Sequence, residues 1–286
     1  MEIDKIKEEL SSVSTKEINY SELAEILKRK KAEAVKLSDE PLAKEIWILE
    51  QVCKIQQRYL EAFNKIKQRD FYNAWCLLEK AEIGLLFLKK HFSINENPYQ
   101  LKFINDVIRK YQSIYPYRLF FSTELIEKEK ECSICGKVYK LRDSCGHITG
   151  EIYNGELCLW KVTKSELVGV AVVENPVHKY AVAFLKSGEG EGVEDNYDYS
   201  SLEYLMKLIN QPFDTWDIDF VVKYVSHNLF KTYSPDETCP CNQTDKTYSE
   251  CCLKEKGVKS LFHEFVVEKP SKEIILPNSI AIKLSK

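Results

Sequence analysis

The first part of the chain carries apolar residues at helical spacing and contains few glycine and proline residues. Between residues 42 and 67, and again between 71 and 92, apolar positions recur at steps of three and four, which is typical of an amphipathic helix. A third stripe covers 103–114 and ends at Pro116. Four or five such helices are expected, so the pattern predicts a helical bundle over residues 1–128.

The period of the pattern changes after residue 130. Short β-prone runs appear at 150–153, 167–174 and 179–185, and a glycine-rich acidic segment at 187–198 is expected to form a solvated loop. Residues 200–232 return to helical spacing, and the tail contains strand-like runs at 262–268 and 273–284. The aromatic segment 113–125 is expected to be a packed linker between the bundle and the domain that follows it.

These changes of pattern predict an α+β multidomain fold with three parts. The N-terminal helical bundle covers residues 1–128, and a central α+β domain covers 129–232. A small C-terminal module with a strand-like tail covers 233–286. The fold class by itself indicates no activity, so function has to be inferred from particular residues.

Composition and charge narrow the class of protein. Hydrophobic residues make up 44% of the chain and aromatic residues 12%, which is enough for a core and excludes a disordered chain. The net charge of −3 argues against electrostatic binding of nucleic acid or membrane over the whole surface, but it leaves a local patch open. Because the sequence shows neither the apolar segment of a signal peptide nor an apolar run of membrane-spanning length, we expect a cytoplasmic protein that does not bind membranes.

The ten cysteines are the feature of the composition that says most about function. In a reducing cytosol, clustered cysteines indicate metal ligands before they indicate disulfides. Cys53 and Cys76 lie on predicted helix faces beside apolar neighbours, where core packing is expected. The other eight fall into two clusters, and each cluster is a candidate metal site.

The first cluster contains five side chains that can bind metal. Cys132 and Cys135 are separated by two residues, the spacing of a zinc knuckle in which both thiolates turn to the same side. A tetrahedral zinc ion takes four ligands, so two of Cys145, His147 and Cys158 would complete the site, and spacing does not decide which two. With more donors than ligand positions, a closed structural site is favoured over a catalytic site with an open position.

The second cluster lies in the segment CPCNQTDKTYSECC at residues 239–252. This segment resembles the SEC-C motif, a small zinc module found at the C-terminal end of the preprotein translocase ATPase and in many unrelated bacterial proteins. The resemblance rests on the CPC start, on Tyr248 and on the terminal pair of cysteines, although the usual glycine-serine-glycine is replaced by NQT and the spacer is one residue longer. The resemblance implies one zinc ion held by Cys239, Cys241, Cys251 and Cys252.

The two clusters predict a zinc-binding protein. A short, loop-rich module has too small a core to fold alone, and bound zinc stabilises such modules by on the order of 10 kcal/mol. We therefore expect two structural Zn²⁺ ions, a central zinc domain and a SEC-C-like C-terminal zinc module, in a protein that recognises a macromolecular partner through these modules. A protein partner is favoured, and nucleic acid is left open.

An enzymatic function is disfavoured, and no catalytic residue is assigned. The chain contains no Walker A, GxGxxG, GxSxG or HExxH motif. The alternative function is a nucleic-acid-directed effector or nuclease-like enzyme of the phage-defence or toxin type, in which the 132–158 cluster and nearby carboxylates act on nucleic acid. An open coordination position would favour this alternative, whereas two closed shells of four ligands would favour the recognition module.

Overall fold

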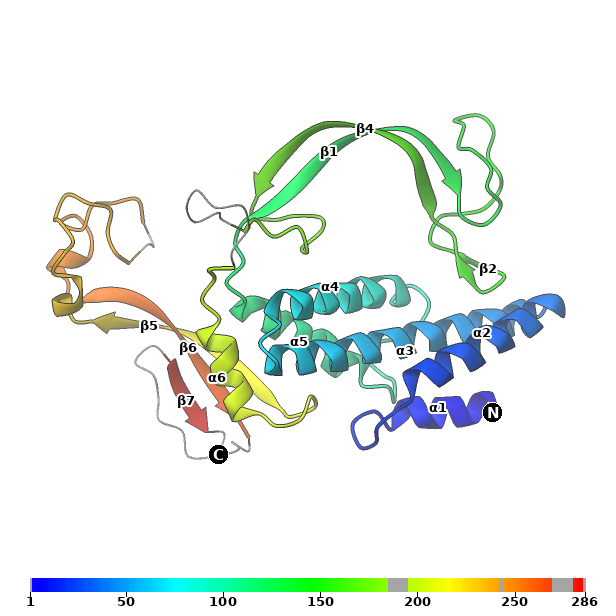
Figure 1. The fold of residues 1–286 in the computed structure, drawn as a ribbon, viewed down its shortest axis with the longest axis horizontal. Helices are drawn as coiled ribbons and strands as arrows, with labels where there is room; N and C mark the ends of the chain where they lie inside the picture. The colour runs from blue at the N-terminus through cyan, green and yellow to red at the C-terminus, as the bar shows by residue number, and fades with distance from the viewer. Residues whose placement is uncertain (1, 185–194, 242–243, 269–279, 285–286) are drawn as a thin grey trace. The chain divides into compact units, whose positions relative to one another are not determined.

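The computed structural model describes residues 2–184, 195–241, 244–268 and 280–284. Over these ranges it contains six α-helices and three small sheets, which confirms the α+β class (Figure 1). The chain forms two compact units, Met1–Tyr199 and Ser200–Lys286. The division into parts at 1–128, 129–232 and 233–286 stays a prediction.

Five helices open the first unit, in agreement with the predicted bundle. Each buries an apolar stripe against its neighbours, and Asp39 caps one of them by accepting a hydrogen bond from the backbone N–H of Leu42 at 3.1 Å. Within the described part of the chain, none of the helices is both long enough and apolar enough to cross a membrane. The helices are α1 (Ile3–Ser11), α2 (Tyr20–Lys36), α3 (Glu40–Lys67), α4 (Phe71–Leu88) and α5 (Leu101–Ile114).

A long two-stranded ribbon follows the helices. β1 (Phe120–Cys132) pairs antiparallel with β4 (Trp160–Val173), and the two strands curve together along their length (Figure 1). The strand predicted at 167–174 is confirmed as part of β4. The expectation of a packed linker over 113–125 is wrong from Phe120 onward, because the chain there pairs with β4. The charged second half of β1 gave no apolar alternation from which a strand could be predicted.

The base of the ribbon is anchored on α4 by an aromatic side chain. Trp75 is 3% exposed and stacks on Phe120, with ring centroids 6.2 Å apart. Its indole N–H donates to the carbonyl oxygen of Lys179 at 2.6 Å. The run 179–185 was predicted as a strand, but over its described residues it forms one isolated bridge, between Val182 and Phe120. The segment therefore runs along α4 and is held there by side-chain contacts, without a continuous set of strand hydrogen bonds.

A short hairpin next to the far end of the ribbon docks on the helices. Its strands are β2 (Ile152–Tyr153) and β3 (Glu156–Leu157), so part of the run predicted at 150–153 is confirmed. Lys31 on α2 forms an ion pair with Glu156 at 2.7 Å. Two further hydrogen bonds hold the same hairpin to the helical bundle: Asn154 N–H to Glu40 Oε2 at 3.0 Å, and His91 Nε2 to Gly150 O at 2.8 Å.

Gly155 at the turn of this hairpin has no room for a side chain. Its φ is +66°, and a Cβ atom there would lie 2.9 Å from the carbonyl oxygen of Ala43. Gly155→Ala is therefore expected to destabilise the first unit by about 1–3 kcal/mol, the usual cost of a left-handed non-glycine residue. Thermal unfolding measures the effect, with Gly169→Ala in the open ribbon as the matched control. Equal unfolding midpoints for the two variants would contradict the docking.

The second unit combines one helix with a three-stranded sheet. α6 (Ser200–Leu208) packs on β6 (Val258–Val267), which pairs antiparallel with β5 (Trp216–Val225) and parallel with β7 (Ile280–Leu284). One 3₁₀ turn, His227–Phe230, precedes the second cysteine cluster, and another, Cys252–Lys254, begins at its last cysteine.

The helix predicted over 200–232 is correct for α6 and wrong for β5. The aromatic and β-branched residues 220–224 fit either period, and pairing with β6 decides in favour of a strand. The strand predicted at 262–268 is confirmed as far as Val267. Residues 187–194 of the acidic loop predicted at 187–198 and residues 273–279 of the tail lie outside the described residues, whereas 280–284 of the predicted run form the strand β7.

Candidate metal centres

Cys132 is the last residue of β1, and Cys135 lies in the turn that follows it. Two backbone hydrogen bonds close this turn. The N–H of Gly136 donates to the carbonyl oxygen of Cys132 at 2.8 Å, and the N–H of Cys132 donates to that of Lys137 at 3.0 Å. Gly136 has a φ of +70°, a left-handed conformation that glycine adopts without strain. The turn brings the two cysteines into one group, as the knuckle spacing predicts.

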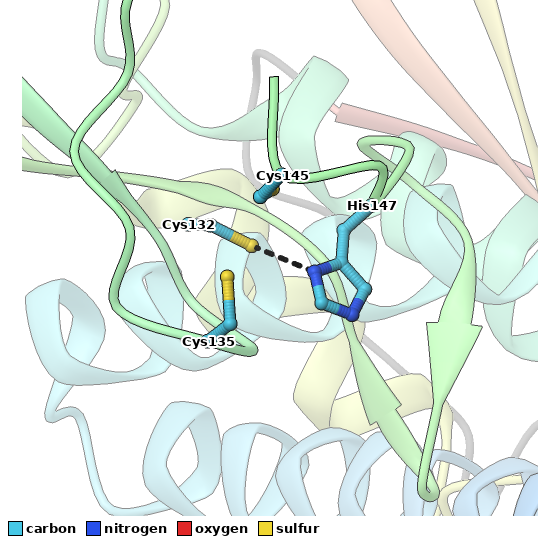
Figure 2. A group of neighbouring side chains, drawn as sticks. All are labelled: Cys132, Cys135, Cys145 and His147. Carbon is cyan, nitrogen blue, oxygen red and sulfur yellow. Dashed lines mark hydrogen bonds between the residues drawn. The ribbon is translucent and has the colours of Figure 1, made fainter. Parts of the chain in front are cut away.

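The following loop brings Cys145 and His147 to the same place. Figure 2 shows the sulfur atoms of Cys132 and Cys135 and the imidazole of His147 directed toward one another. The distance between Cys132 Sγ and His147 Nδ1 is 3.7 Å, and the His147 ring packs edge-on against Tyr153 at 4.7 Å between centroids. Four ligand atoms, which all lie within 4.8 Å of one another, could hold a metal ion: those of Cys132, Cys135, Cys145 and His147.

Cys158, the fifth predicted donor, lies beside this group of four. It follows β3 and is 1% exposed, and its Sγ atom lies 3.9 Å from Cys132 Sγ. Its N–H donates to the carbonyl oxygen of Glu151 at 2.8 Å, and its own carbonyl oxygen accepts from the N–H of Gly150 at 2.8 Å. The fold therefore gathers all five predicted residues, with Cys158 in contact with Cys132.

The fold favours a negative charge on Cys132. Burial would raise the pKa of this thiol, but the backbone N–H groups of Cys135 and Ile134 donate to the sulfur and bring its pKa down to about 6. Burial and the neighbouring Cys132 sulfur raise the pKa of Cys158 to about 11. Ionisation of Cys132 is therefore favoured, and ionisation of Cys158 beside it is disfavoured.

The second group is formed by four cysteines that lie between β5 and β6 in the chain. Cys251 is central: its Sγ atom is 3.8 Å from that of Cys241 and 3.7 Å from that of Cys252. Burial opposes ionisation of Cys239, but the backbone N–H groups of Cys241 and Cys252 lower its pKa to about 7. The ligand atoms that all lie within 4.8 Å of one another are those of Cys239, Cys241, Cys251 and Cys252, and they could hold a second metal ion.

A very small core surrounds the second group. Cys239, Tyr248, Cys252 and Val258 are buried together, with Phe230 packed against them. Half of these four buried residues are themselves candidate ligands. Apolar burial on this scale supplies little stability by itself.

His227 joins this core, although the sequence indicated an isolated histidine. Its Nε2 atom lies 2.9 Å from the carbonyl oxygen of Glu255, which can only accept, so Nε2 carries the proton. In the neutral imidazole, Nδ1 then accepts from the hydroxyl group of Tyr248 at 2.6 Å. No local spacing indicates this contact, because 21 positions separate His227 from Tyr248.

Tyr248→Phe removes this hydrogen bond and leaves Nδ1 of His227 without its donor. We expect the second unit to lose about 1–2 kcal/mol of stability, while both metal groups keep all their ligands. Hydrogen exchange at the backbone N–H of Leu253, which donates to Tyr248 O, measures the change. Tyr233→Phe, at a side chain that is 44% exposed, is the matched control and should leave the exchange rate unchanged.

The remaining cysteines and histidines lie outside both groups. Cys53 is 2% exposed in the helical bundle, as predicted for a core residue, and Cys76 is half-buried on α4. His178 stacks on Tyr180, and Nδ1 of His263 is 2.8 Å from the hydroxyl group of Ser201.

The chain matches no protein-family model, no curated protein and no solved structure. Its class is therefore defined by the fold and the two groups: an α+β protein with two Cys/His clusters that could each hold a metal ion. The resemblance of residues 239–252 to the SEC-C motif stays a prediction.

Proposed function

We propose that the protein binds two structural zinc ions and that the metal-held modules recognise a macromolecular partner, with protein favoured. The observation that carries the proposal is the donor set: three cysteines and a histidine in one group, and four cysteines in the other. Thiolate and imidazole donors in groups of four are typical of tetrahedral zinc, whereas calcium and magnesium take oxygen ligands.

The number of donors supports a structural role. Four protein ligands fill a tetrahedral shell and leave no position for water or a substrate, whereas a catalytic zinc site keeps one position open. Both groups contain four such ligands, and the first has an additional thiol beside it. This supports a recognition protein over the nuclease-like alternative.

The surface of the first module favours a protein partner. Two large apolar side chains are exposed between Cys135 and Cys145, Tyr139 at 44% and Leu141 at 87%, and Ile148, next to His147, is 64% exposed. Exposed apolar side chains that gather on one loop indicate a protein contact more than a contact with phosphates. Because Cys135 and Cys145 flank Tyr139 and Leu141 in the chain, bound metal would fix the shape of the segment between them.

Metal analysis tests the zinc part of the proposal. Protein purified without a metal-binding tag should contain two zinc ions per chain, and fewer would remove one of the sites.

Affinity purification from the native cytosol, with mass spectrometry and nucleic-acid detection, tests recognition. Leu141→Glu should release a partner protein, while Leu37→Glu, at another highly exposed leucine (79%) at the end of α2, should retain it. Nucleic acid recovered in stoichiometric amount would overturn the preference for protein.

A further inference from the structure

The first group has one donor more than a tetrahedral ion uses. We infer, resting on the proposed zinc function, that Cys158 is not a metal ligand but donates its S–H to the Cys132 thiolate and so positions that ligand. The compact set of four consists of Cys132, Cys135, Cys145 and His147, and Cys158 adjoins it through a sulfur–sulfur contact of 3.9 Å.

The direction of this hydrogen bond follows from the chemistry of the ligand. A cysteine binds zinc as the thiolate, which has no proton to give. With Cys132 bound to zinc as the thiolate, Cys158 is the partner that can donate across the 3.9 Å contact. Cys158 is 1% exposed, so water does not compete for this contact.

Hydrogen bonds through Ser133 and Leu159 hold the two sulfur atoms together without help from the metal. Ser133, next to Cys132, donates its N–H to the carbonyl oxygen of Leu159 at 2.9 Å. Leu159, next to Cys158, donates its own N–H to Ser133 Oγ at 2.8 Å. This reciprocal pair fixes the two chain segments side by side, so Cys158 is placed against Cys132 by the fold.

The second group has donors of the same kind outside its four cysteines. Thr244 Oγ1 lies 3.6 Å from Cys251 Sγ, and the backbone N–H of Lys259 lies 3.5 Å from Cys252 Sγ. Donors of this kind orient metal ligands and tune them, and their loss typically weakens metal binding by roughly 10–100-fold. In the first group, the thiol of Cys158 takes this role.

Cadmium-113 NMR of the full chain loaded with ¹¹³Cd²⁺ tests the assignment, because a shell of four thiolates and a shell of three thiolates with one imidazole give separate resonances. The wild-type protein should show one resonance of each kind. Cys158→Ala should keep both resonances, while the first zinc ion binds roughly 10–100-fold more weakly in a chelator competition. Cys158→Ser restores a hydrogen-bond donor and should recover most of that affinity.

Cys76→Ala, which removes a half-buried thiol on α4, is the matched control and should match the wild type in both measurements. Two four-thiolate resonances in the wild type, or loss of one metal ion in Cys158→Ala, would make Cys158 a ligand and overturn the inference, while two-site zinc binding stands. Equal weakening in the Ala and Ser variants would overturn the donor role. Binding of fewer than two metal ions by the wild type would instead contradict the proposed function.

Discussion

Replacing Cys251 and Cys252 together by serine is expected to remove one of the two proposed zinc ions and to unfold the segment around them. Of the four residues buried together here, only Tyr248 and Val258 are not candidate ligands, so little apolar burial remains once the metal is lost. Bound zinc supplies on the order of 10 kcal/mol in small modules, more than the whole stability of many domains.

Metal content and limited proteolysis measure the outcome. Zinc should fall from two ions to one per chain, and new cleavage should appear between residues 230 and 258, while the helical circular dichroism of the first unit persists. Cys76→Ser, outside both groups, should retain both ions and the original cleavage pattern. Unchanged proteolysis of residues 230–286 in the double variant would count against the second site.

Trp75→Ala is expected to lower the free energy of unfolding of the first unit by about 3–5 kcal/mol, the range for large aromatic truncations in a core. Trp75 packs against Tyr115 and Tyr117 at 4.9 and 5.0 Å between ring centroids, and it stacks on Phe120 at the base of the ribbon. Its loss also leaves the carbonyl oxygen of Lys179 without its donor.

Urea unfolding followed by circular dichroism measures this loss. Leu86→Ala is the matched control on the same helix, because Leu86 is 62% exposed and its truncation should change stability by no more than about 0.5 kcal/mol. If the two variants unfold at similar urea concentrations, Trp75 does not anchor the ribbon as described.

The helices could be predicted from the sequence because their signal is local. Every third or fourth residue of a helix faces the core, as Ile46 and Val52 do in α3. These positions are apolar, so the stripe they form can be seen in the sequence. The strands β1 and β5 could not be predicted in the same way. Each pairs with a strand that lies far away in the sequence. In β1, residues 127–131 also alternate between glutamate and lysine, so this part of the strand has no apolar face.

The candidate ligands could be predicted for the same reason as the helices. Two cysteines in one turn are brought together by the turn itself, as the hydrogen bond from Gly136 to Cys132 shows. The roles of Cys158 and His227 depend on partners that only the fold brings near. Spacing could therefore propose five donors for the first site, but it could not separate the compact four from the fifth.

Each set of four ligands comes from one short stretch of chain, 132–147 in the first group and 239–252 in the second. Closing a short loop costs little chain entropy, so the donors can gather before the distant strands pair. During synthesis, the first stretch leaves the ribosome well before the second. The helices that precede it can form from contacts within their own sequence, before later residues are made. We therefore expect the two groups of candidate ligands to assemble in chain order, the first while the second is still being made.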